Sequence, residues 1–309
     1  MEKNDEFDIK NFLKICDIQS RTNNAHFNYN RFVEAIIKND NQTIEETKTY
    51  KLLIEMLSNG KKRFKENLSA NSKLYRARII DITDINKLSV VGDRLFGLNK
   101  YESKEPPLNK SNEGRNNIAG ASYLYLARDP YTAVAECKPF RSSYLSVAIF
   151  NTKQTLNIFN FCDNDKVDEL QEIQKSEYYM VSKLVENVMR TFYSAVYNDK
   201  IGYRVSQYIS DLVRKFGYDG MAYKSFISNG KNYTIFNCAD TNIEFVESEI
   251  VQVIAQHIDI MSLNNGEIVK KTKNFKLPTK DVITDFKKYL IDKINFLNGI
   301  DETGGTKND

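Results

Sequence analysis

The first 70 residues carry apolar positions at a helical period. Apolar side chains recur three and four residues apart in three runs, residues 12–18, 32–37 and 52–57, and this spacing is typical of one buried face of an α-helix. Gly60 weakens the third run, and the pattern changes after it. We therefore predict an all-helical N-terminal module over residues 1–72.

From residue 73 onward, apolar residues alternate with polar ones over short segments, which is the pattern of strands. Strands are predicted over residues 73–82, 121–127, 145–149, 156–159, 221–226, 232–237, 242–246 and 251–258. Helices are predicted from Asp129 onward and over residues 167–197, 203–216 and 281–297. Strands with hairpin signals, rather than a regular βαβ alternation, predict an α+β fold with an antiparallel or mixed sheet. A Rossmann fold is disfavoured, because no Gly-x-Gly-x-x-Gly follows a strand.

The predicted elements divide the chain into four parts. After the helical module, residues 73–262 form the main domain, and residues 263–298 form a linker with an amphipathic C-terminal helix. Residues 299–309 are polar and rich in glycine, so we expect a disordered tail. Within the main domain, residues 84–113 look like a long irregular stretch, which in a compact domain is typical of a binding loop or lid.

Composition excludes several classes of protein. The chain has 309 residues, 41% of them hydrophobic, with no apolar run long enough to span a bilayer and a charged N-terminus unlike a signal peptide. We therefore expect a cytoplasmic protein. A net charge of +3 from 44 basic and 41 acidic residues makes a nucleic-acid partner unlikely. Four scattered cysteines and two histidines predict neither a metal site nor a disulfide framework.

One stretch, residues 114–136, combines loop, strand and helix signals with reactive side chains. A polar loop lies between Gly114 and Gly120, a strand follows, and Asp129 precedes Pro130 as a helix N-cap precedes the first helical residue. Two readings of this stretch are open. In one, Arg115, Tyr125 and Glu136 face a single cleft. In the other, the glycines serve loop geometry, the tyrosine packs in the core and the glutamate is solvated, as most glutamates are.

This stretch resembles the core of the RES domain, a family of bacterial NAD-consuming toxins. The resemblance rests on Gly114, Arg115, Asn116 or Asn117, Gly120, Tyr125 and Glu136. Three further segments match in the same order: Leu74-Tyr75-Arg76-Ala77-Arg78 before it, and Gly217–Ser225 and Asn232–Asn237 after it. The doubled asparagine leaves open which of the two takes the family's position.

The resemblance implies a fold, a substrate and a set of site residues. The fold is ADP-ribosyltransferase-like, with two small mixed or antiparallel sheets enclosing an NAD cleft. The implied catalytic residues are Glu136, Tyr125, Arg76 and Ser225. The implied NAD-binding residues are Arg76, Arg115, Asn117, Tyr125, Ser225 and Asn232. NAD is the substrate, and no other cofactor and no metal is expected.

The resemblance implies an enzyme that cleaves the nicotinamide–ribose bond of NAD by glycohydrolysis or phosphorolysis. An anionic carboxylate suits this reaction, because positive charge develops on the ribose in the transition state. Two alternatives are open: a mono-ADP-ribosyltransferase that modifies a protein or nucleotide, and a catalytically inactive interaction module on the same scaffold. The resemblance implies an antitoxin or immunity protein as a partner. A homodimer is also open, because the helical N-terminal module offers a docking surface for a dimer or an antitoxin.

Overall fold

The computed structural model describes most of the chain between residues 9 and 253. Its ranges are 9–58, 64–92, 94–107, 111–162, 183–189, 200–225, 227–228, 230–253, 260–261, 268–270, 288 and 291. The predicted helix over residues 167–197 is described only at 183–189, which are helical. His257, the predicted tail and nearly all of the predicted C-terminal helix lie outside these ranges.

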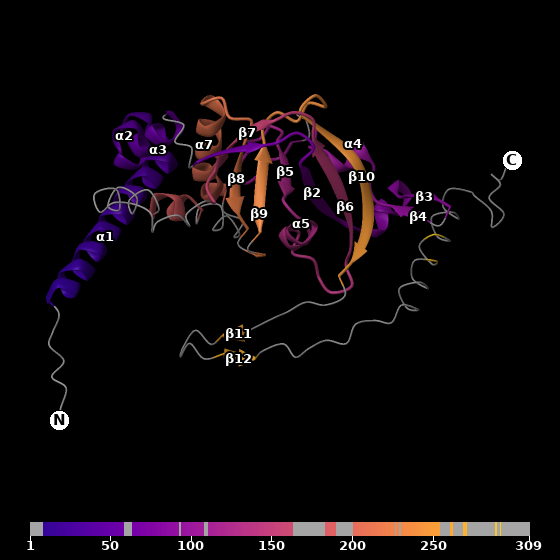
Figure 1. Ribbon diagram of the computed structural model, residues 1–309, viewed down its shortest axis with the longest axis horizontal. Coiled ribbons are helices and arrows are strands. Elements are labelled where there is room, and N and C mark those ends of the chain that lie inside the picture. The colour runs from indigo at the N-terminus through magenta and orange to yellow at the C-terminus, as the bar shows by residue number, and fades with distance from the viewer. Residues whose placement is uncertain are drawn as a thin grey trace.

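Three helices lie at the start of the described chain, and they confirm its helical character but not the predicted division. The runs 12–18 and 32–37 lie in a single first helix, the run 52–57 lies in the third, and the short second helix was not predicted. The three helices are α1 (Ile9–Lys38), α2 (Asn41–Glu46) and α3 (Lys48–Ser58), and they lie beside the later helix α7 (Lys200–Lys215) at one end of the molecule (Figure 1). Asp40 caps α2, because its Oδ1 accepts a hydrogen bond from the amide of Thr43 at 3.1 Å. Gly217 has φ of +82° just after α7 ends, the left-handed conformation that commonly stops a helix.

The N-terminal helices share one hydrophobic core with α7 and with the sheet. This cluster contains Phe32 of α1, Leu53 of α3 and Ile209 of α7 together with Phe159 and Met221 from two strands. The helices therefore bury their apolar faces against the main domain, and this core extends across the boundary predicted at residue 72. Within the predicted all-helical module, Lys65–Leu68 forms strand β1 instead, so the all-helical description is wrong for these residues.

Ten strands join into one mixed sheet. They are β1 (Lys65–Leu68), β2 (Lys73–Ile80), β3 (Ser89–Val91), β4 (Arg94–Phe96), β5 (Leu124–Ala127), β6 (Tyr144–Thr152), β7 (Leu156–Asn160), β8 (Gly220–Lys224), β9 (Lys231–Ile235) and β10 (Ile243–Gln252). The order is β1-β7-β8-β9-β5-β2-β6-β10-β4-β3. β7 and β8 are parallel, whereas the other pairs in this sheet are antiparallel. Two short strands, β11 (Ile260–Met261) and β12 (Ile268–Lys270), pair separately.

The strand connections require this sheet to fold over on itself. Residues 69–72 alone connect β1 to β2, although these strands are first and sixth in the order. Five strand spacings in a flat sheet span about 24 Å, whereas so short a connection reaches no more than about 18 Å. The amide of Asn71 also donates to the carbonyl of Thr152 at the end of β6, at 2.7 Å. The half of the sheet formed by β1-β7-β8-β9-β5 and the half formed by β2-β6-β10-β4-β3 therefore approach each other at this end.

The prediction of two small sheets is wrong in one respect, because the halves are continuous. A single residue pair, Tyr75 on β2 opposite Ala127 on β5, joins the half β1-β7-β8-β9-β5 to the half β2-β6-β10-β4-β3. The α+β prediction with a mixed sheet is otherwise confirmed. Pattern alone did not reveal the junction, since one pair of facing residues leaves no periodic signal.

Other predicted boundaries also need correction. The stretch 84–113 is not one irregular loop, because it contains β3, β4, the end of the 3₁₀ helix Ile82–Lys87 and the short helix α4 (Lys100–Ser103). The strand predicted over 242–246 and the first two residues of the strand predicted over 251–258 belong to one strand, β10, with a register shift between Phe245 and Glu247. Residues 254–258 lie outside the described ranges. These segments mix polar and apolar residues too evenly for periodicity to detect them.

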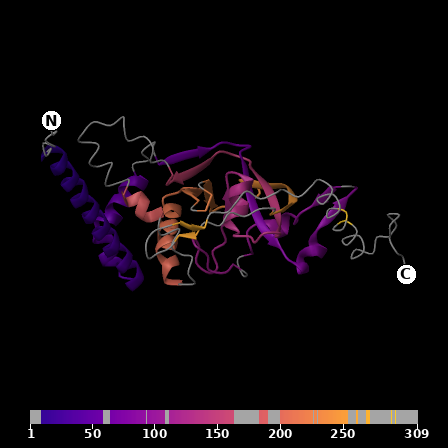
Figure 2. The ribbon, with the colours of Figure 1, turned by 90° about the horizontal axis from the view of Figure 1, so that it is seen from below.

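Helix α5 (Pro130–Glu136) lies over the junction between the two halves of the sheet, seen from two sides in Figures 1 and 2. It packs against β2, β5 and β6. Asp129 caps it as predicted, because Oδ1 accepts from the amide of Thr132 at 2.8 Å, and Pro130 occupies its first position. This arrangement brings the end of α5, where Glu136 lies, to the junction.

Candidate active site

A small pocket lies where the two halves of the sheet join. Its volume is about 220 Å³. It is lined by residues of β2, β5, α5, β8, β9 and the loop after Glu113: Tyr75, Arg76, Ala77, Arg115, Tyr125, Leu126, Ala127, Ala133, Glu136, Cys137, Tyr223 and Asn232. Five of the seven predicted site residues are in this set, and Ser225 contacts one of them. Asn117 does not line the pocket.

The Glu136 carboxylate is held through one oxygen. Its Oε1 accepts hydrogen bonds from Ser225 Oγ and from Asn232 Nδ2, both at 2.7 Å. Its Oε2 accepts no hydrogen bond from any residue that the structure describes. Glu136 is the last residue of α5, where the helix dipole disfavours negative charge. The two hydrogen bonds offset that effect and leave a fixed carboxylate with one oxygen free to act on a ligand.

The Ser225 hydroxyl is hydrogen-bonded to Glu136 and is not among the groups that line the pocket. The hydroxyl donates its single proton to Glu136 and accepts from the amides of Ile227 and Ser228, each at 3.2 Å. Both Ser225 and Asn232 are almost fully buried. The sequence predicted that these two residues bind NAD directly, whereas the structure places their polar groups on the carboxylate.

Arg115 brings a positive charge to the same pocket. Its guanidinium makes no hydrogen bond or ion pair within the described ranges, although its backbone carbonyl accepts from Ser206 Oγ. Its charge is close enough to hold down the pKa of Tyr125 and Tyr223, although burial raises both overall. A guanidinium with no hydrogen-bond partner among the described residues suits an anionic group such as phosphate.

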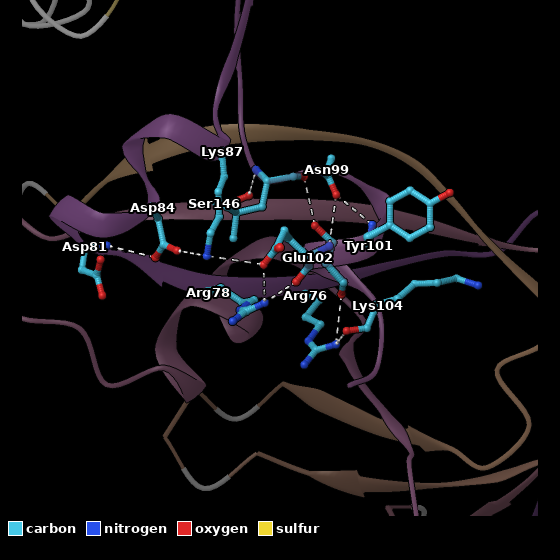
Figure 3. A network of polar contacts seen from close by, with 12 residues as sticks. Arg76, Arg78, Asp81, Asp84, Lys87, Asn99, Tyr101, Glu102, Lys104 and Ser146 are labelled. Atoms are coloured by element: carbon cyan, nitrogen blue, oxygen red, sulfur yellow. Dashed lines mark hydrogen bonds and ion pairs between the residues drawn. The ribbon is translucent and has the colours of Figure 1, made fainter. Parts of the chain in front are cut away.

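Arg76 is more constrained than the sequence predicted. Its Nη1 donates to the carbonyls of Ser103 and Lys104 at 3.0 and 2.6 Å, and the neighbouring Arg78 contacts Glu102 (Figure 3). Burial and the charge of Arg78 lower the pKa of Arg76 to about 10, so it stays protonated at neutral pH. Arg76 thus lines the pocket as a cation while it also holds the chain after α4.

Tyr125 and the asparagine pair fix the arginine loop. The Tyr125 hydroxyl donates to Asn117 Oδ1 at 2.7 Å and accepts from the amide of Asn116 at 3.0 Å. Asn117 Nδ2 donates to the carbonyl of Ala121 at 2.7 Å, so its side chain staples the loop. Burial raises the pKa of Tyr125, so it remains a protonated donor. Its hydroxyl is therefore engaged by the loop, while the residue also lines the pocket.

Gly114 permits this network because a side chain there would occupy its space. A Cβ on Gly114 would lie 2.4 Å from Asn117 Oδ1 and 3.1 Å from the Tyr125 hydroxyl. We expect Gly114→Ala to displace the loop and to lower activity at the pocket by about tenfold or more, as misplaced binding groups do. Gly92→Ala is a comparison outside the site, because a Cβ there meets nothing within 4 Å, although its φ of +57° adds backbone strain. Equal activity of Gly114→Ala and wild type would contradict this role.

Sequence reasoning missed several pocket residues. Tyr75 and Tyr223 line the pocket with Tyr125. Cys137 also lines it, but burial raises the pKa of its thiol to about 11, which makes it a poor nucleophile at neutral pH. Tyr75 and Tyr223 belong to the matched segments, and only the pairing of distant strands shows that they face the pocket.

Features of other classes of site are absent from the described part of the chain. Among those residues, no group of His, Cys, Asp and Glu could hold a metal ion. Of the described cysteines, Cys137 and Cys238 are free thiols. The helices described include none that is long and apolar enough to cross a membrane.

The fold and site define a mixed α/β protein with a charged pocket at a junction in its sheet, and the comparisons name its family. The family model described as "RES domain" matches residues 94–257, more than half of the chain. The chain therefore belongs to the RES domain family, which confirms the resemblance found in the sequence. The match covers Arg115, Tyr125, Glu136, Ser225 and Asn232, but it begins after Arg76.

The solved structures that resemble this chain include a weak likeness to a chain of a toxin-antitoxin complex. A chain in the crystal structure of the M. tuberculosis MbcT-MbcA toxin-antitoxin complex is 10% identical, with a TM-score of 0.34 over 65% of this chain and 92% of that chain. No curated protein matches.

Proposed function

We propose that this RES domain protein is a toxin-type enzyme that cleaves the nicotinamide–ribose bond of NAD. The observation that carries the proposal is the Glu136 carboxylate, fixed through Oε1 by Ser225 and Asn232, with Oε2 free in a pocket that also holds the Arg115 guanidinium. Family membership supports the choice of NAD.

The chemistry asks for a fixed negative charge. The bond between the ribose anomeric carbon and the nicotinamide nitrogen breaks, and neutral nicotinamide leaves with the electron pair. Positive charge then develops on the anomeric carbon and the ring oxygen, and a carboxylate held in place stabilises it without reorganisation. Water or phosphate forms the new carbon–oxygen bond. When water attacks, one proton is released.

The size of the pocket indicates which part of NAD it takes. A volume of about 220 Å³ is below the range of about 300–1,000 Å³ typical of whole-ligand sites. The pocket therefore suits the nicotinamide–ribose end, with the rings of Tyr75, Tyr125 and Tyr223 as apolar walls. Arg115 is the main candidate for the pyrophosphate, because its donors are free, and Arg76 contributes its charge.

The group that accepts the ADP-ribose distinguishes the proposed NAD-cleaving enzyme from the alternative functions. Purified protein is incubated with NAD, with and without inorganic phosphate and with and without a chelator, and the products are resolved by mass spectrometry. Free ADP-ribose indicates a glycohydrolase, and ADP-ribose phosphate indicates a phosphorylase. We expect turnover to be unchanged by the chelator, because the proposed reaction uses no metal.

The same assay tests the two alternatives. Labelled ADP-ribose transferred to macromolecules of a lysate would identify an ADP-ribosyltransferase. An intact NAD pool in every arm would identify an inactive module and would contradict the proposal. A neutralising antitoxin belongs to the proposal on family grounds. A homodimer belongs to it as one use of the N-terminal helices as a docking surface, and the mass of the protein in solution tests it.

A further inference from the structure

We infer that Gln207, assisted by Ser206, is a positioning residue for the reaction, because it holds the loop that presents Arg115 to the pocket. The inference rests on the proposed function. Gln207 lies on α7, outside the pocket, and is only 6% exposed. The sequence predicted only a helix over residues 203–216, and no motif marks Gln207.

Gln207 forms hydrogen bonds with both ends of the turn that carries Arg115. Its Nε2 donates to the carbonyl of Gly114 at 2.9 Å and to the carbonyl of Asn117 at 3.1 Å. The same Nε2 also donates to Glu113 Oε1 at 3.1 Å. The amide of Gly114 donates to the carbonyl of Asn117 at 2.9 Å, which closes the turn over Arg115 and Asn116.

Ser206 completes the clamp from the neighbouring position. Its Oγ donates to the carbonyl of Arg115 itself. Because the Arg115 guanidinium has no partner among the residues described, the backbone of the turn determines where its side chain begins and which region it can reach. Side-chain donors of α7 thus reach three successive points on this turn, the carbonyls of Gly114, Arg115 and Asn117.

A displaced turn would affect the two sides of the pocket unequally. The opposite face of the turn is held by the Tyr125 hydroxyl through Asn116 and Asn117. Losing Gln207 would leave these bonds and the Glu136 site in place, so the carboxylate stays fixed while Arg115 moves. A shift of about 1 Å in a substrate-positioning group lowers rates by up to a hundredfold. We expect the loss to act mainly through Arg115, as a rise in KM.

The experiment is a double-mutant cycle with a substrate-independent readout. Gln207→Glu keeps the size of the side chain but replaces the amide donor by a carboxylate oxygen. Gln207→Leu removes the donor and the acceptor of the amide. Ser206→Ala removes the hydrogen bond to the carbonyl of Arg115. Each is made in wild type and in Arg115→Ala. Ser210→Ala, one turn further along α7, is the matched control, since Ser210 is fully buried and its Oγ has no hydrogen-bond partner in the described structure.

We expect both Gln207 variants to lower kcat/KM for NAD by about 10- to 100-fold in wild type, and by less than about threefold in Arg115→Ala, because coupled residues are non-additive. Hydrogen exchange over residues 113–117 should rise in the Gln207 variants and not in Ser210→Ala.

An equal loss of kcat/KM in wild type and in Arg115→Ala, or unchanged hydrogen exchange, would overturn the inference. If Gln207→Leu does not fold, Gln207→Glu and Ser206→Ala decide. If wild type does not consume NAD, the proposed function fails, while the exchange measurement still decides whether Gln207 positions the turn.

Discussion

Glu136→Gln is expected to lower kcat for NAD cleavage by about a hundredfold, equivalent to about 3 kcal/mol, the effect of removing one electrostatic stabiliser of a transition state. The substitution keeps the size of the side chain and an acceptor oxygen for Ser225 and Asn232, which now bond Oε1. The fold is therefore expected to survive. What is lost is the negative charge, which acts only as the ribose becomes cationic.

Turnover and NAD binding are measured separately for this variant, by product formation and by calorimetry. We expect binding to change little, because the charge serves the transition state. Glu244→Gln is the control, since Glu244 forms a surface ion pair with Lys153 and does not line the pocket. Unaltered turnover in Glu136→Gln would remove Glu136 from the mechanism.

Phe32→Ala is expected to destabilise the whole protein by about 3–5 kcal/mol, the usual result of truncating a buried phenylalanine. Phe32 is fully buried on α1 and packs edge-on against Tyr208 of α7, with ring centroids 6.0 Å apart. Phe27, five residues earlier on the same helix, is 67% exposed. We expect Phe27→Ala to change stability by no more than about 0.5 kcal/mol.

Unfolding in denaturant, followed by circular dichroism, measures both variants. A loss in the Phe32 variant within one cooperative transition would show that α1 belongs to the core of the main domain. For the same reason, a fragment that begins at residue 73 would leave the apolar faces of α7 and β7 uncovered. Two separate transitions, with only the first shifted by Phe32→Ala, would restore the independent module predicted from the sequence.

Local signals predicted the parts of the site that are contiguous in sequence. Asp129 and Pro130 set the start of α5, Gly217 marks the end of α7, and the order of the matched segments indicated one pocket. These features depend on backbone conformation and capping, which neighbouring residues determine. Those signals left open whether Arg115, Tyr125 and Glu136 face one cleft. The resemblance to the RES domain implied that they do, and in the structure all three line one pocket.

The remainder depends on contacts between distant strands. Nothing local indicates that Ser225 would spend its proton on Glu136, 89 residues earlier in the chain, or that Arg76 would donate to the carbonyls after α4. The choice between the two asparagines was equally hidden: both are buried, with Asn117 bonded into the loop and Asn116 to Thr234. Pairwise geometry of this kind arises from the fold of the sheet, not from the period of any one segment.

Nicotinamide release tests the central claim most directly. Proton NMR of NAD incubated with purified wild type, beside Glu136→Gln at the same concentration, follows the loss of the anomeric signal and the growth of free nicotinamide. The predicted result is full conversion by wild type and a rate about a hundredfold lower for the variant. Intact NAD with wild type, or equal nicotinamide release by both proteins, would contradict the account.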